Sequence, residues 1–359
     1  MNSNNFCIIM AGGTGSRFWP LCDGQNPKQF IDMFGTGKSM LQSTFERFEQ
    51  LCPRENIIIV TAAQYEERVR QQIPHLLDYQ VLLEPQRRNT APCVAYAAAV
   101  IHEINPNANI IVSPSDHAVF QQENFVRDLS TAIAITDQRD WIITLGAQPR
   151  DPNTKYGYIQ MADQPSLPDV ESVHKVVTFT EKPPVEMAMQ FIMTGEFLWN
   201  AGLFIWRLPV LIEAYKKYLP ALWESFFQLG ISSSPAEVER AYAEVEGISV
   251  DYGIIEKADN VHVMQASFGW SDVETWDSLY DTCPKDPSRN AVASGRVLSY
   301  DCHGCIVHIP HGKTLVMQGL EDYIITHTGS TLMICRRDQA ERTAKFASDY
   351  ELQNSRHTD

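Results

Sequence analysis

Short apolar runs alternate with longer stretches of helical periodicity through the first 146 residues. The apolar runs are bounded by polar or turn-forming residues and are rich in Ile and Val, as expected for strands that are buried on both faces. Alternation of this kind predicts βαβ units and a mostly parallel sheet. The predicted strands are 6–10, 56–61, 80–84, 109–113 and 141–145, and the predicted helices are 40–51, 64–76, 90–103 and 123–138.

The pattern changes twice further along the chain. Residues 147–280 continue the same sheet in mixed order, with strands expected at 156–161, 173–180, 197–206 and 261–266 and helices at 184–194, 208–227 and 235–246. From about 290 to 334, short β-branched runs between Gly, Asp and His predict a small all-β module, followed by a helix near 337–350. We therefore predict an α/β fold with a Rossmann-like, mixed sheet over residues 1–285 and a small β-rich module over 286–359.

Charge and composition narrow the class of function. The formal net charge of −15 argues against nucleic-acid binding, which relies on clustered Lys and Arg. No apolar stretch approaches the roughly 20 residues of a membrane span, and the first strand has no basic region before it. The eight cysteines mostly stand singly in the sequence, as expected of reduced packing thiols. These features favour a cytoplasmic protein that binds neither membrane nor nucleic acid.

A glycine-rich turn follows directly after the first strand. The sequence Ala11-Gly12-Gly13-Thr14-Gly15-Ser16-Arg17 lets backbone amides approach phosphate oxygens, and Arg17 and Lys28 supply positive charge. An ordinary tight turn is the structural alternative. A dinucleotide fingerprint would require Gly at position 18, where Phe18 stands, so NAD binding is not expected.

A second glycine-rich segment, Gly35-Thr36-Gly37-Lys38-Ser39, ends like a Walker loop. Asp32 occupies the place of its leading glycine, and no strand precedes it. We therefore expect a turn before the helix at 40.

Acidic residues mark the ends of the third and fourth predicted strands, which is where ligands bind in such sheets. Glu84 begins the segment EPQRRNTAP and is suited to accept the adjacent N1 and N2 donors of guanine, although a solvated strand-end acid is nearly as good an interpretation. Asp116 in PSDH, and far downstream Asp272 in GWSD, are candidate Mg²⁺ ligands, since Mg²⁺ takes one or two carboxylates besides phosphate and water oxygens. Spacing alone does not pair them.

Three further segments have the chemistry to bind a sugar phosphate: YGYI around Gly157, TEKP with Glu181 and Lys182, and WNAGLF with Asn200. A different series, Cys302, Cys305, His308 and His311, leaves zinc open, but the gap between the histidines is short for a zinc site and packing is favoured.

Taken in order, AGGTGSRFWPL, PKQF, EPQRRNTAP, PSDH, YGYI, FTEKP, WNAGLFIW, VDYGIIEK and GWSDVETW resemble the mannose-1-phosphate guanylyltransferases. The resemblance covers about residues 7–280 and continues more weakly beyond. It implies a nucleotide-diphospho-sugar transferase fold with a C-terminal β-helical module that often serves self-association, so a homodimer is expected. It also implies Mg²⁺ as cofactor, with GTP and mannose 1-phosphate as substrates and GDP-mannose and pyrophosphate as products.

The resemblance assigns roles by position. Arg17 and Lys28 would neutralise the departing pyrophosphate, and Asp116 and Asp272 would hold Mg²⁺. The sugar phosphate would contact Gly157, Glu181, Lys182 and Asn200. The nucleotide would contact Ala11, Gly12, Gly13, Gly15, Ser16, Glu84, Asn89, Thr90 and Ser115. The rival hypotheses are a related transferase for another sugar phosphate or nucleotide, and a non-catalytic regulator that binds GDP-mannose.

Overall fold

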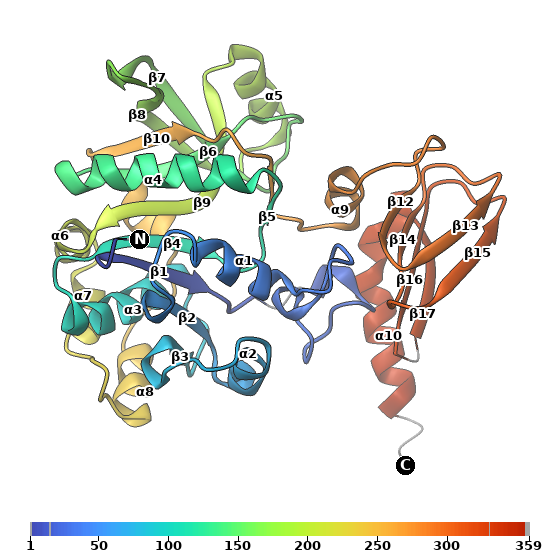
Figure 1. Cartoon of the computed structure of the whole chain (residues 1–359), viewed down its shortest axis with the longest axis horizontal. Helices are drawn as coiled ribbons and strands as arrows, with labels where there is room; N and C mark the ends of the chain where they lie inside the picture. Colours follow the sequence, from blue (N-terminus) through green and yellow to red (C-terminus); the bar gives the residue numbers. More distant parts are fainter. Residues whose placement is uncertain (1, 14–15, 330, 356–359) are drawn as a thin grey trace. The chain divides into compact units, whose positions relative to one another are not determined.

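The computed structural model describes residues 2–13, 16–329 and 331–355. By compactness the chain divides into two units, each assembled from several segments (Figure 1). Unit 1 contains 1–12, 45–115 and 119–270, and unit 2 contains 13–44, 116–118 and 271–359. The boundary between two domains that we predict after residue 285 stays a prediction.

Unit 1 is built on a mixed sheet, which has nine strands among the described residues, in the order β3-β2-β1-β4-β9-β6-β10-β8-β7. The parallel strands are β1 (Asn5–Met10), β2 (Ile57–Ala62), β3 (Val81–Glu84), β4 (Asn109–Pro114), β6 (Ile142–Ala147) and β10 (Val261–Gln265). The antiparallel strands are β7 (Gly157–Leu167), β8 (Val170–Glu181) and β9 (Phe197–Arg207). The predicted strand positions and the mixed order of the second half are therefore confirmed.

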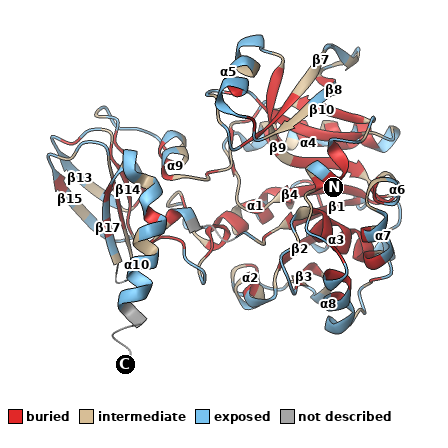
Figure 2. Ribbon diagram, turned by 180° about the vertical axis from the view of Figure 1, so that it is seen from behind, coloured by how far each residue is buried: buried red, intermediate tan, exposed pale blue. Residues whose placement is uncertain are grey.

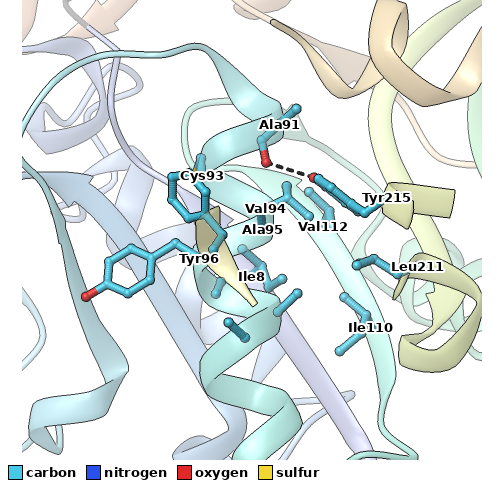
Figure 3. Packing of buried hydrophobic residues seen from close by; sticks show 14 of the residues in the cluster. Ile8, Ala91, Cys93, Val94, Ala95, Tyr96, Ile110, Val112, Leu211 and Tyr215 are labelled. Atoms are coloured by element: carbon cyan, nitrogen blue, oxygen red, sulfur yellow. Dashed lines mark hydrogen bonds between the residues drawn. The ribbon is translucent and has the colours of Figure 1, made fainter. Parts of the chain in front are cut away.

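One face of this sheet carries the largest core. Ile8 of β1 and Val112 of β4 pack against α3 (Thr90–Ile104), where Val94 and neighbouring residues are fully buried (Figure 3). From Ala91 to Ile101 the residues of α3 are all buried, as expected of a helix segment that is enclosed on every side. The hydroxyl of Tyr215 enters this core and donates to the Ala91 carbonyl at 2.7 Å, so the buried hydroxyl is satisfied.

The other face is covered by α4 (Gln122–Gln138), whose Phe125 meets Phe48 edge-on at 5.7 Å between ring centroids. Because alternate strand residues point to opposite faces, Ile9 lies opposite to Ile8 and is equally buried. Burial on both faces explains why these strands are continuous apolar runs in the sequence, and they form the buried centre of unit 1 in Figure 2.

The prediction of a single helix over 208–227 is wrong. The structure has two helices there, α6 (Leu208–Tyr218) and α7 (Pro220–Phe226). Pro220 stands at the first position of α7, where its missing N–H costs nothing, and the residue before a proline is disfavoured in helical conformation. Further α-helices with residues in unit 1 are α1 (Met40–Phe48), α2 (Glu66–Gln72), α5 (Val185–Thr194) and α8 (Pro235–Ala243).

Unit 2 contains the β module. Strands β12 (Ala291–Ser294), β14 (Ile306–His308) and β16 (Tyr323–Thr328) pair in parallel, as do β13 (Arg296–Tyr300) and β15 (Thr314–Gln318). The chain thus passes alternately between two parallel ladders, which is the coil of a short β-helix, and β17 (Thr331–Arg336) closes one ladder in antiparallel. The predicted small β-helical module is confirmed.

The terminal helix begins later than predicted. A 3-10 segment over Arg337–Arg342 precedes α10 (Thr343–Ser355), and Gln339 has non-helical backbone angles there. The core of unit 2 joins the β module to the segment after the glycine turn, since Phe18 and Ile306 of β14 belong to one buried cluster. In this cluster Phe18 meets Trp276 of α9 (Trp276–Thr282) at 5.3 Å between ring centroids. Among the described residues, no helix is long and apolar enough to cross a membrane.

Candidate functional site

Glu84 ends β3 and lies beside the glycine turn. A Cβ placed on Gly12 would stand 3.2 Å from the Glu84 Oε2, so the approach of these two segments favours a residue without a side chain at position 12. The Tyr242 hydroxyl donates to Glu84 Oε1 at 3.0 Å. Burial raises the pKa of Glu84 to about 7, although the Tyr242 hydrogen bond and the Arg87 charge act in the opposite direction. The alternative interpretation of Glu84 as a solvated acid at a strand end is therefore wrong, because Glu84 is only 7% exposed.

Asn89 caps the start of α3. The Asn89 side chain accepts from the Thr90 N–H at 2.9 Å, and Asn89 adopts a positive φ of 67°. The Thr90 hydroxyl accepts from the Val250 N–H at 2.9 Å, and the Ala91 N–H donates to the Ile248 carbonyl at 3.0 Å. One of the predicted nucleoside contacts, Thr90, thus also helps to fix the segment around 248–250 against this helix.

In unit 2, Lys28 joins the two acidic segments that spacing alone could not pair. Its ammonium lies 2.9 Å from Asp116 Oδ2 and donates to the main-chain carbonyls of Asp272 at 2.6 Å and Val273 at 3.1 Å. A lysine has three N–H donors, so these partners account for all of them. Lys28 is 5% exposed, and a buried ammonium is tolerated when it is paired in this way. The two segments that carry the predicted Mg²⁺ ligands therefore meet at Lys28.

The charge state of Asp116 follows from this cluster. Burial would raise the pKa of Asp116, but the Lys28 ammonium and His117 more than offset burial and hold that pKa below its ordinary value. The carboxylate is thus ionised at neutral pH, as a divalent cation requires. Among the described residues no group of three or more His, Cys, Asp or Glu could hold a metal. Two carboxylates fit Mg²⁺, which completes its shell with phosphate and water oxygens.

Arg17 is held by a residue that the sequence analysis did not single out. Its guanidinium forms an ion pair with Glu274, two residues after Asp272, and its side chain remains 55% exposed. Gln29, which is 1% exposed, donates to the Gly13 carbonyl at 3.0 Å and so fixes one end of the glycine turn. Gly15 lies outside the described residues, as does the side chain of Ser16.

Two further predicted nucleotide contacts, Ala11 and Ser115, directly follow the ends of β1 and β4. Ala11 is fully buried after β1, and its N–H donates to the Val60 carbonyl at 2.8 Å. Ser115 is buried after β4, and its N–H donates to the Met10 carbonyl at 3.0 Å. These bonds continue the parallel ladder into the segments that carry the predicted site.

The four predicted sugar-phosphate residues come together in unit 1. Gly157 of β7 pairs in register with Glu181 of β8, and a Cβ on Gly157 would stand 2.5 Å from Glu181 Oε2 and 3.4 Å from the Asn200 Cβ. The Lys182 ammonium lies 2.9 Å from Glu181 Oε1. A glycine is required here because any side chain would enter the space between the acid and the amide.

Asp251 completes this group and was missed as a site residue. It begins a π-helical turn (Asp251–Ile255), and its Oδ1 accepts from Asn200 Nδ2 at 2.7 Å. Burial and then the nearby Glu181 raise the pKa of Asp251 to about 6. The only available signal was the acid within VDYGIIEK, a motif that the sequence analysis used for resemblance without assigning its residues.

The segment 35–39, whose sequence ends like a Walker loop, folds around the carboxylate of Asp32. Asp32 accepts from the N–H groups of Thr36 at 2.9 Å and Gly37 at 2.6 Å, so a carboxylate takes the amides that a phosphate would use. Gly35 has φ +64°, and a Cβ there would stand 2.7 Å from the Ala293 carbonyl oxygen. The predicted turn is confirmed.

The cysteine and histidine series also has a packing explanation. Cys302 and Cys305 are buried in an apolar cluster of the β module with Val307. The Nε2 of His308 lies 2.9 Å from the Asp32 carbonyl, and that of His311 lies 3.3 Å from Asp32 Oδ2. The two histidines therefore bind the loop described above.

Comparison with known proteins identifies the family of this chain. Residues 6–289 match the family model described as nucleotidyl transferase. The chain belongs to the nucleotidyl transferase family. It is 30% identical to mannose-1-phosphate guanylyltransferase of Escherichia coli, over 98% of this chain and 77% of that protein. It is 31% identical to the alginate biosynthesis protein AlgA of Pseudomonas aeruginosa, over 98% of this chain and 73% of that protein.

Solved structures extend the similarity of this nucleotidyltransferase beyond the matched family segment. The crystal structure of a Thermus thermophilus protein named mannose-1-phosphate geranyltransferase has a TM-score of 0.87 and 29% identity, covering 97% of this chain and 99% of that chain. A glucose-1-phosphate thymidylyltransferase structure from Bacillus anthracis, at 17% identity and a TM-score of 0.50, shares the fold over 77% of this chain. The β module thus has a counterpart in the Thermus protein.

Proposed function

We propose that this nucleotidyltransferase transfers GMP from GTP to mannose 1-phosphate, giving GDP-mannose and pyrophosphate. The observation that carries the proposal is the Lys28 cluster, in which one buried ammonium contacts the Asp116 carboxylate and the main chain of Asp272. The names of the relatives support mannose 1-phosphate and a guanine nucleotide as substrates. The buried acceptor Glu84 supports a base that presents N–H donors, as guanine does.

The reaction proposed is an in-line displacement. An oxygen of the mannose 1-phosphate phosphate attacks the α-phosphorus of GTP, the bond to the bridging oxygen breaks, and pyrophosphate leaves. The attacking phosphate is already ionised, so no general base is needed. Catalysis then rests on aligning two anions and neutralising their charge.

Each charged residue has a separate task in this scheme. Arg17 is largely exposed and exchanges Glu274 for the leaving phosphates. Lys28 keeps Asp116 ionised and lends its charge to the same cluster. Asp116 and Asp272 would hold Mg²⁺, which when bound would polarise the phosphoryl oxygens. Glu181, Lys182, Asn200 and Gly157 bind the sugar phosphate.

The test is the release of pyrophosphate by the purified protein. GTP, ATP, UTP and dTTP are each combined with mannose 1-phosphate and with glucose 1-phosphate, with Mg²⁺ and with a chelator. We expect the highest kcat/KM for GTP with mannose 1-phosphate and no turnover in the chelator. A preference for another pair would make the chain a different sugar-phosphate nucleotidyltransferase. Tight GDP-mannose binding without turnover would make it a regulator.

We infer that the protein works in a reducing compartment such as the cytoplasm. Its eight cysteines are all buried thiols without a disulfide, which supports that location. The net charge of −15 supports the absence of a nucleic-acid partner. Proteolysis of intact cells and of lysates would test the location, since a cytoplasmic protein is degraded only after lysis.

A homodimer is also proposed, with the β module as its interface. Leu298 and Val316 are register neighbours on β13 and β15 and are 50% and 63% exposed, and Tyr300 on the same strand as Leu298 is 56% exposed. Light scattering after chromatography would test this, with Leu298→Glu expected to give a monomer and wild type a dimer. A monomeric wild type would refute it.

A further inference from the structure

The Asn200 carboxamide is held on both sides. Its Oδ1 accepts from the Gly202 N–H at 3.1 Å and from the Thr144 hydroxyl at 3.2 Å. A backbone N–H can only donate, so the atom that faces it must be the oxygen and the orientation of the amide is fixed. A carboxamide oxygen accepts two hydrogen bonds, and both are used.

The nitrogen side of the amide is held by Asp251. Asn200 Nδ2 donates to Asp251 Oδ1 at 2.7 Å, the short distance expected of a hydrogen bond to a charged acceptor. An amide nitrogen has two N–H groups. Within the described part of the chain, these contacts leave Asn200 with one N–H to offer a ligand.

Glu181 supplies the complementary chemistry beside this N–H. Its Oε2 and the Asn200 Cβ both border the space in front of Gly157. An ionised carboxylate only accepts, whereas the locked amide only donates. The neighbouring Glu181 is also one cause of the raised pKa of Asp251, after burial, which agrees with the two acids being close.

We propose that Asp251 is a positioning residue for sugar-phosphate binding, which holds Asn200 so that its amide presents a single N–H to an acceptor oxygen of the sugar phosphate. This inference rests on the proposed function, and it adds that Asn200 discriminates between ligands as a donor and never as an acceptor. Asp251 acts through Asn200 without touching the ligand. Its loss should therefore affect the sugar phosphate and leave the nucleotide unaffected.

Two substitutions at position 251 separate the acceptor from the charge. Asp251→Leu keeps the approximate shape and removes the acceptor, and we expect the KM for mannose 1-phosphate to rise about tenfold, as for the loss of one well-placed hydrogen bond. Asp251→Asn keeps an acceptor oxygen and should stay within about threefold of wild type. In both variants the KM for GTP should be unchanged, and kcat should change less than about threefold. Equal KM values for mannose 1-phosphate in wild type and Asp251→Leu would overturn the proposal.

A double-mutant cycle identifies the residue through which Asp251 acts. Asn200→Ala removes the donor itself, so adding Asp251→Leu to it should raise the KM for mannose 1-phosphate no further. If the two effects multiply instead, Asp251 acts independently of Asn200 and the positioning role is wrong. The cycle remains informative if Asp251→Leu alone is unstable, because Asp251→Ala can replace it in both arms.

A matched control is available in unit 2, where Asn290 Nδ2 donates to Asp286 Oδ2 at 3.1 Å. Asp286→Leu should lower the melting temperature without changing the KM for mannose 1-phosphate. If wild type turns over no sugar phosphate, the proposed function and this inference both fail. If wild type is active but Asp251→Leu, like Asp286→Leu, leaves the KM for mannose 1-phosphate unchanged, only this inference fails.

Discussion

The Tyr242 hydroxyl donates to Glu84 Oε1 at 3.0 Å and is fully buried, as is most of the carboxyl group. A carboxyl group that is mostly buried and has a neutral hydrogen-bond donor is poorly compensated, because burial removes much of the water that would solvate its charge. That oxygen, Oε2, is the one beside Gly12. The free protein therefore holds an acceptor that gains from a ligand with N–H donors.

This cost should be visible in stability. The pKa of Glu84 is about 7 in the folded protein against 4.5 for the free side chain. A folded pKa above the unfolded one contributes stability that is complete below pH 4.5 and is lost as pH rises through 7. Without ligand, the unfolding free energy of Glu84→Gln relative to that of wild type should therefore be about 2 to 3 kcal/mol more favourable at pH 8 than at pH 5, because only wild type loses this contribution. Denaturant titrations at both pH values measure this, with exposed Glu239→Gln on α8 as control; parallel curves would contradict it.

The same group should govern nucleotide binding. Only ionised Glu84 accepts from guanine through both oxygens, and a group with a pKa of about 7 is ionised to about a tenth at pH 6 and nine tenths at pH 8. The KM for GTP should therefore fall about tenfold from pH 6 to 8. Initial rates across this range measure it. Glu84→Gln should show a raised KM for GTP that stays flat with pH, and a variant that follows the wild-type curve would assign the titration to another group.

Lys28 and Asp272 should both be required for turnover. We expect Lys28→Ala and Asp272→Ala each to lower kcat by at least about a hundredfold, the usual loss for a charge-stabilising group. Removing Lys28 also removes the cation that lowers the pKa of Asp116, so the remaining activity of Lys28→Ala should decline toward acidic pH. Single-turnover rates with saturating substrates measure both effects. Near-normal kcat in both variants would refute the assignment.

The sequence predicts the strands well and the helix ends less well, for identifiable reasons. Burial on both faces makes β1 and β4 continuous apolar runs that need no partner to be recognised. The break at Leu219 depends on one proline within an otherwise helical pattern, and it was overlooked. The antiparallel insertion of β9 between β4 and β6 is a tertiary fact, of which the sequence indicated only that the order was mixed.

The site shows a similar division. A residue at a strand end, such as Glu84 at the end of β3, is predictable because ligands of such sheets bind at the carboxyl ends of parallel strands. Partners recruited from elsewhere are not: Tyr242 lies 158 positions from Glu84, and nothing local marks it. Glu274 and Asp251 stood within quoted motifs, but only the folded chain shows which side chain each of them holds.

The loop around Asp32 gives a test that separates structure from catalysis. Burial would raise the pKa of Asp32, but hydrogen bonds from Thr36, Gly37, His311 and Phe34 more than offset burial and lower that pKa. A folded pKa below the unfolded one contributes stability above the unfolded value that is lost as pH falls through the folded value. Asp32→Ala leaves backbone amides without their acceptor, so we expect a loss of about 1 to 3 kcal/mol in unfolding free energy at pH 7 and a smaller loss near pH 3.

Lys38→Ala is the matched variant for this loop. Because the amides of the loop bind Asp32 and not a phosphate, Lys38 has no triphosphate to hold, and its loss should leave kcat and the KM for GTP within about twofold of wild type. Denaturant unfolding and steady-state rates on both variants provide the measurements. A large rise in the KM for GTP in Lys38→Ala, with stability unchanged in Asp32→Ala, would mean that this loop binds nucleotide after all and that the glycine turn after β1 is not the phosphate site.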